Sequence, residues 1–116
     1  MKHALITLMG LISFTAQAAF FSGNDLLNRL NQETSNPNAY ILAQGYIVGV
    51  VDAYDDVLFC IPKEVRVGQL VDMTKNNLRN RPDARHSTVA SAYVVTALSA
   101  AFPCPKQEPQ WHQERY

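Results

Sequence analysis

The stretch Phe59–Asp72, FCIPKEVRVGQLVD, decides how the chain folds. Pro62 cannot continue a helix, and it biases Ile61 away from the helical region of backbone conformation. A helix that reaches Cys60 from the N-terminal side must therefore end there, and a new helix is predicted to begin near Val67. The stretch predicts a corner between two helices, with a cysteine inside the corner.

The helix after this corner is predicted to cover Val67–Asn80, with Gly68 and Gln69 in its first turn. Gln69 lies three residues after Arg66, the expected N-cap. Its side chain can accept a hydrogen bond from the Arg66 backbone N–H, which is half of a capping box. The inner face is marked at helical spacing by Leu70, Val71, Thr74 and Leu78.

Two helices are expected before the corner. A short one is predicted over Asp25–Gln32, with Asn24 as its cap. The longest begins at Pro37, where a missing N–H is harmless, and Asn36 is its natural N-cap. Its apolar character continues through the acidic residues to about Leu58.

The last helix is predicted to run from Ser87, a favourable cap, to Ala101, where Pro103 and Pro105 follow. Its apolar residues recur at helical spacing and form one continuous stripe. No stretch alternates apolar and polar residues over strand length. The sequence therefore predicts an all-α fold, a small orthogonal bundle of four or more helices.

The first 18 residues have the composition of a secretory signal peptide. Lys2 and His3 precede an apolar run, Ala4–Phe14, and Ala16 and Ala18 have the small-x-small spacing of a cleavage site. The run is shorter than the roughly 20 apolar residues that cross a bilayer, so a membrane anchor is the weaker interpretation. We expect cleavage after Ala18, export, and no membrane attachment of the mature chain.

Cys60 has three conceivable roles: a nucleophile, a metal ligand or half of a disulfide. Cys104 is the only other cysteine. Export implies an oxidising compartment, and two cysteines with none left over predict one bridge, Cys60–Cys104. A loop of this length gives about 4 kcal/mol of stabilisation in the chain-entropy model.

As a nucleophile Cys60 would need a catalytic base, and as a metal ligand it would need further ligands, and the sequence offers neither. His86 is the one histidine outside the predicted signal peptide and the tail, and its ordinary role is that of a surface or capping residue. Two cysteines without C-x-x-C spacing do not make a zinc site. Because no phosphate-binding loop or hydrolase motif occurs either, the sequence predicts a protein that is not an enzyme and has no cofactor or metal.

An acidic group lies near the end of the long predicted helix. Asp52, Asp55 and Asp56 are spaced to share one helix flank, next to Tyr54. Negative charge at a helix C-terminus opposes the helix dipole. Three interpretations stay open: a solvated flank, a patch that docks on a partner, and a carboxylate pair for acid–base chemistry.

Gly45 and Gly49 share one face of the same helix. Each costs up to about 1 kcal/mol against alanine, so close approach of another helix is the natural reason for them. Internal packing is the favoured interpretation, and a groove for a partner chain is the alternative.

The charge balance excludes one class of partner. Without Lys2, nine basic and ten acidic residues remain, whereas nucleic-acid binding needs a basic excess.

The polar segment 105–116 is predicted to be an extended tail after a helical domain at 19–104. Trp111 and Tyr116 in the tail are conceivable partner contacts.

Four segments resemble a known family: Gly45–Tyr54 (GYIVGVVDAY), Phe59–Met73 (FCIPKEVRVGQLVDM), Arg81–Ser87 (RPDARHS) and Ala97–Cys104 (ALSAAFPC). In this order they are similar to the Rap/Tai immunity proteins of Gram-negative bacteria. Arg66 departs from the pattern, because the family usually has threonine there, whose hydroxyl would cap the helix.

The resemblance implies a disulfide-bonded, all-helical periplasmic protein, often a homodimer, similar in shape to the acid-stress chaperones of the periplasm. Studied members bind amidase effectors of type VI secretion, which cut peptidoglycan peptides, and plug the active-site cleft. The expected partner is thus a cognate peptidoglycan amidase toxin, with Asp52, Tyr54, Asp55 and Asp56 as the candidate contact surface. A periplasmic acid-stress chaperone is the alternative.

Overall fold

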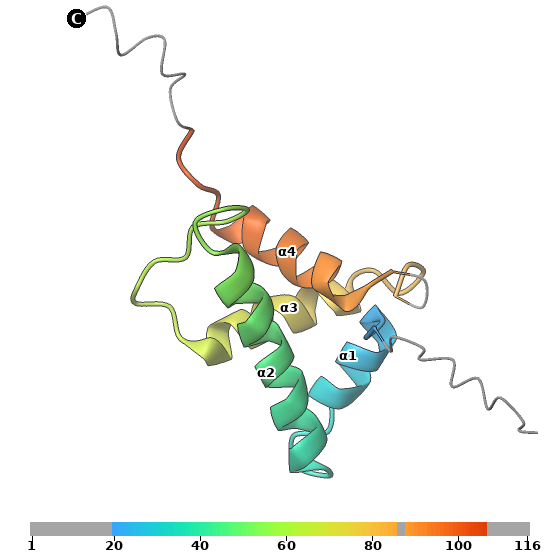
Figure 1. Cartoon of the computed structure of the whole chain (residues 1–116). Helices are drawn as coiled ribbons and strands as arrows, with labels where there is room; N and C mark the ends of the chain where they lie inside the picture. Colours follow the sequence, from blue (N-terminus) through green and yellow to red (C-terminus); the bar gives the residue numbers. More distant parts are fainter. Residues whose placement is uncertain (1–19, 86–87, 107–116) are drawn as a thin grey trace, which may run out of the picture.

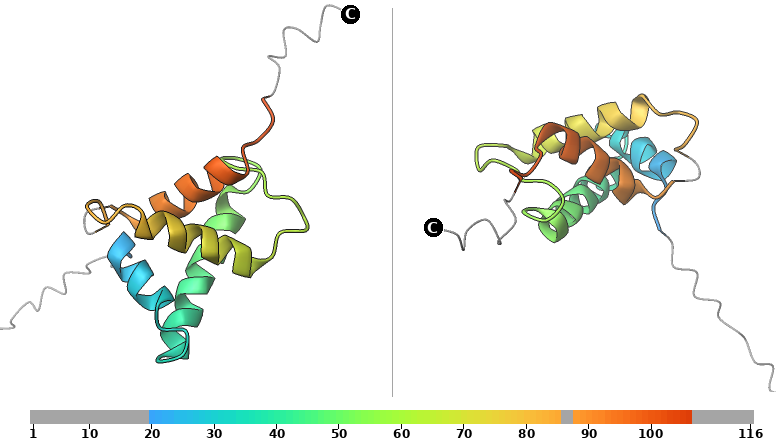
Figure 2. Two further views of the ribbon diagram at one scale, coloured as in Figure 1. Left: turned by 180° about the vertical axis from the view of Figure 1, so that it is seen from behind. Right: turned by 90° about the horizontal axis from the view of Figure 1, so that it is seen from above.

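The computed structural model describes residues 20–85 and 88–106. These ranges hold four helices, α1 (Gly23–Leu30), α2 (Pro37–Tyr54), α3 (Val67–Arg79) and α4 (Ala90–Ala101), and no extended strand (Figure 1). In Figure 2, α3 and α4 lie side by side while α2 crosses them steeply. The predicted all-α bundle with one disulfide is confirmed.

The core is filled by apolar side chains from all four helices and from the corner after α2. Phe59, at that corner, is completely buried although it lies outside any helix. Burying a large apolar side chain contributes roughly 1.5–3 kcal/mol. The other apolar side chains with no exposed surface are Leu26, Leu30, Ala43, Ile47, Leu78, Ala90, Val94 and Leu98.

Helix α1 is capped by Ser22, so the prediction of Asn24 as the cap is wrong. The Ser22 hydroxyl accepts from the Asp25 backbone N–H at 3.1 Å, and the Asp25 carboxylate accepts from the Ser22 N–H at 3.0 Å. This reciprocal pair satisfies two donors that a cap at Asn24 would leave open. The same bonds from Ser22 hold the pKa of Asp25 below its usual value.

Helix α3 begins at Val67 as predicted and ends one residue early. The Arg66 N–H donates to Gln69 Oε1 at 2.8 Å, which confirms the predicted half of a capping box. Arg66 offers no side-chain acceptor, so the other half is missing.

Helix α4 begins at Ala90, later than predicted, and Ser87 lies outside the described residues. The start is delayed because the chain before α4 pairs with the chain before α1. The Ala90 N–H donates to the Phe21 carbonyl, and the Gly23 N–H donates to the Thr88 carbonyl. These bonds keep Val89 extended.

Helix α2 ends at Tyr54, whereas the sequence predicted a continuation to Leu58. The Asp55 N–H still bonds to the Val51 carbonyl at 2.8 Å, but Asp56 has a φ of 65°. A left-handed residue cannot continue a right-handed helix. None of the described helices has both the length and the apolar character that crossing a membrane requires.

The tightest backbone approach is at Gly23, where a Cβ would lie 2.6 Å from the Tyr93 ring and 3.1 Å from the Arg85 carbonyl oxygen. We expect Gly23→Ala to lower the free energy of unfolding by about 1–3 kcal/mol, because α1 must shift away from α4. Urea denaturation measures this change.

Gly68→Ala is the matched control, because no atom lies within 4 Å of a Cβ at that position of α3. It should leave stability unchanged or raise it by up to about 1 kcal/mol. Equal effects of the two substitutions would contradict the packing described at Gly23.

Candidate partner-binding turn

The turn that follows α2, residues 55–60, is organised by the carboxylate of Asp55. Its Oδ1 accepts from the Asp56 N–H at 3.1 Å and from the Ile61 N–H at 3.0 Å. One side chain thus joins the first residue of the turn to the residue just beyond it. Asp55 is half-buried in this role.

Asp56 reverses the chain direction with its positive φ, a conformation that aspartate tolerates better than most residues. Its N–H also donates to the Phe59 carbonyl at 2.8 Å. Because the Phe59 side chain is fixed in the core, the turn is tied to the rest of the protein at its far end.

A second set of bonds ties the turn to the end of α4. Cys60 forms a disulfide with Cys104, and its N–H donates to the Phe102 carbonyl at 2.8 Å. The Ser99 hydroxyl donates to the Leu58 carbonyl at 3.1 Å. The predicted bridge is confirmed, and its sulfur atoms are not available as nucleophiles.

The turn exposes two apolar side chains at its tip. Val57 is 69% exposed and Leu58 is 47% exposed, although the backbone N–H groups of both residues bond to the Tyr54 carbonyl. Exposed aliphatic side chains on a fixed backbone are typical of protein–protein contact sites.

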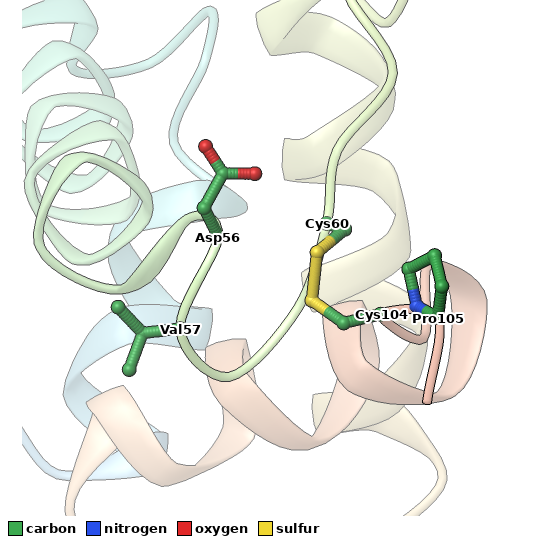
Figure 3. A pocket seen from close by; sticks show the side chains of 5 residues that line it. All are labelled: Asp56, Val57, Cys60, Cys104 and Pro105. Carbon is green, nitrogen blue, oxygen red and sulfur yellow. A yellow bond between two sulfur atoms is a disulfide. The ribbon is translucent and has the colours of Figure 1, made fainter. Parts of the chain in front are cut away.

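An open cavity of about 600 Å³ lies beside the turn (Figure 3). Asp56 and Val57 form one side of it, and the disulfide with Pro105 forms the other. The cavity therefore combines one carboxylate with apolar walls.

The exposed face of α2 is a separate apolar surface. Ile41 is 61% exposed and Leu42 is 54% exposed, and Gly45 and Gly49 follow on the same side. Apart from the neighbouring residues and backbone of α2 itself, no atom lies within 4 Å of a Cβ at either glycine. The interpretation of these glycines as an internal helix crossing is therefore wrong.

Within residues 20–85 and 88–106, no three His, Cys, Asp or Glu side chains gather closely enough to hold a metal ion. His86, the histidine considered as a partner of Cys60, lies outside the described residues.

The chain was compared with models of known protein families. The family model of the Rap1a immunity proteins matches residues 22–104, which includes every described helix, the turn and both cysteines. The chain belongs to the Rap1a immunity protein family. This confirms the resemblance to Rap/Tai immunity proteins. A search of curated proteins found no match.

In this Rap1a protein the four predicted contact residues, Asp52, Tyr54, Asp55 and Asp56, do not all lie on one surface. Asp52 and Tyr54 lie on the last turn of α2 and are exposed, and Asp56 is exposed in the turn beyond it. Asp55 faces inward to its two N–H donors, so it holds the turn instead of offering a free carboxylate. The three aspartates do not share one helix flank.

Sequence reasoning missed Val57 and Leu58 as surface residues, because they continue the apolar pattern of α2. The available signal was the Asp55–Asp56 pair, since aspartate is favoured at turns and at positive φ. Ile61 and Pro62 do separate α2 from α3, and Gly68 and Gln69 lie in the first turn of α3 as predicted.

Proposed function

We propose that this protein is a periplasmic immunity protein that binds a peptidoglycan amidase effector of type VI secretion and blocks its active site. The family match over residues 22–104 is the observation that carries the proposal, because an immunity protein acts through a protein partner. The amidase and the secretion route come from the resemblance of the motif series to Rap/Tai proteins.

The turn after α2 supports a mechanism of steric occlusion. Val57 and Leu58 project from a backbone that is held by the Asp55 carboxylate, the Cys60–Cys104 disulfide and the buried Phe59 ring. A surface that is ordered before binding loses less conformational entropy when the partner arrives. The turn can therefore enter a cleft as a rigid plug and exclude substrate without any chemistry.

Charged and aromatic side chains beside the tip extend this surface. Asp52, Tyr54 and Asp56 are exposed and lie within five residues of Val57 in the sequence. The Asp55 carboxylate accepts from the Asp56 N–H and so holds the last of these residues in place. Aromatic anchors and a polar rim around an apolar centre are the usual composition of a tight interface.

The proposed compartment fits the cysteine chemistry. A disulfide between Cys60 and Cys104 persists only where the environment is oxidising, as in the bacterial periplasm. The signal peptide that would deliver the chain there, residues 1–18, lies outside the described residues.

Substitution of the turn tip tests the function. Where an amidase with a Cys–His pair is encoded beside this protein, that amidase is the partner to use, and isothermal titration calorimetry measures the dissociation constant. Val57→Asp should raise that constant at least about tenfold, because a carboxylate would be buried without a partner.

Val67→Asp is the matched control, because Val67 is also exposed but lies at the start of α3. It should bind like the wild type. Equal binding by both variants would remove the turn from the interface, and no binding by the wild-type protein would count against the amidase as partner.

We also propose that the exposed face of α2 joins two copies of the protein. Gly45 and Gly49 leave room for a second backbone, and no residue from Pro37 to Val51 is charged. An antiparallel pair of α2 helices would place Gly45 of one copy opposite Gly49 of the other, as a twofold axis requires.

This arrangement predicts a dimer that Leu42→Lys converts to a monomer, because Leu42 flanks the two glycines and the lysines would be buried. Sedimentation equilibrium of the mature protein at micromolar concentrations distinguishes the two states. Val67→Lys, on α3, should stay dimeric. A monomeric wild type would contradict the arrangement.

A further inference from the structure

The cavity beside the disulfide has the properties of a subsite for one side chain of the partner. Its volume of about 600 Å³ is within the range of small-ligand sites. Figure 3 shows Asp56 on one side of the opening, and Cys60, Cys104 and Pro105 across from it. Both sides belong to segments that the disulfide joins covalently, so their separation is fixed.

The Asp56 carboxylate is unpaired within the described part of the chain. The bonds that hold the turn use its backbone N–H and the carboxylate of Asp55, and none uses its own side-chain oxygens. Lys106 follows Pro105 in the chain, and no ion pair joins it to Asp56 among the described residues. The negative charge at the cavity is therefore available to a ligand.

The residues that line the cavity favour a ligand with one positive charge and an apolar stem. An exposed carboxylate attracts a guanidinium or ammonium group, and arginine pairs with it through two parallel hydrogen bonds. The disulfide sulfurs and the Pro105 ring offer apolar surface for the methylene groups of a long side chain. Arginine is also enriched at protein interfaces, whereas lysine is depleted there.

We propose that this cavity binds an arginine side chain of the protein partner, with the guanidinium on Asp56 and the methylene stem against the disulfide and Pro105. This inference rests on the proposed function, because it names the chemistry that the effector presents to the turn. It assigns Asp56 a direct contact, in contrast to Asp55, which positions the turn.

A single substitution can test the role of the Asp56 charge. Asp56→Asn removes the charge but keeps the shape, and asparagine tolerates the positive φ of this position as well as aspartate does. Asp83→Asn makes the same chemical change at an exposed site that does not line the cavity. Lys106→Gln tests whether the protein's own lysine competes for the site.

The probe is N-acetyl-arginine methylamide, added to the ¹⁵N-labelled, oxidised mature protein and followed by amide chemical shifts. We expect saturable shifts at Asp56, Val57, Cys60 and Cys104, with a dissociation constant in the millimolar range. Asp56→Asn should abolish saturation, while Asp83→Asn should not change it. N-acetyl-citrulline methylamide, a neutral analogue of the same shape, should give no saturable shifts.

Equal shifts with the citrulline analogue, unchanged binding by Asp56→Asn, or the absence of saturable shifts would each overturn the assignment. Tighter binding by Lys106→Gln alone would show that Lys106 occupies the site in the free protein, and would overturn the account of a vacant carboxylate. Because the probe contains no effector, these outcomes leave the immunity function to the separate amidase test.

Discussion

The fold and its candidate binding surface both depend on the joint between the turn after α2 and the end of α4. The Cys60–Cys104 disulfide makes this joint covalent, and the bond from the Cys60 N–H to the Phe102 carbonyl aligns the two segments. Buried Phe59 adds an apolar anchor next to the disulfide. The chain is thus fixed where it leaves its longest helix.

A fixed joint has a direct consequence for recognition. The N–H groups of the turn bond to the Tyr54, Phe59 and Phe102 carbonyls and to the Asp55 carboxylate. The apolar side chains of Val57 and Leu58 stay exposed on this fixed backbone. A mobile loop with the same side chains would lose entropy on binding, at roughly 0.5–1.5 kcal/mol for each ordered side chain.

The sequence was sufficient to predict each of the four described helices, their order and the cysteine pair. Pro37 and Pro62 are strong local signals for helix boundaries, and the start of α3 follows from Pro62 together with the nearby bond between the Arg66 N–H and Gln69. Asp52, Tyr54 and Asp56, the residues predicted to contact a partner, are exposed, and their contact with a partner stays a prediction.

The features that sequence reasoning missed are decided by tertiary contacts. At the end of α2 the Asp55 carboxylate accepts a hydrogen bond from the Ile61 N–H, six residues away, which no periodicity reveals. The sequence could not tell whether the face of α2 that carries Gly45 and Gly49 points to the core or to solvent, because apolar residues occur on every side of this helix. The start of α4 depends on pairing with Phe21, at the other end of the domain.

Backbone amide hydrogen exchange of the oxidised protein tests the central claim, that the turn is ordered before any partner binds. The amides of Asp56, Cys60 and Ile61 are hydrogen-bonded, whereas those of Lys63 and Glu64, in the same connection, have no bond within the described chain. We predict that the first three exchange at least about tenfold more slowly, after correction for intrinsic rates, as expected for protected groups. Equal rates in the two sets would contradict a preformed binding turn.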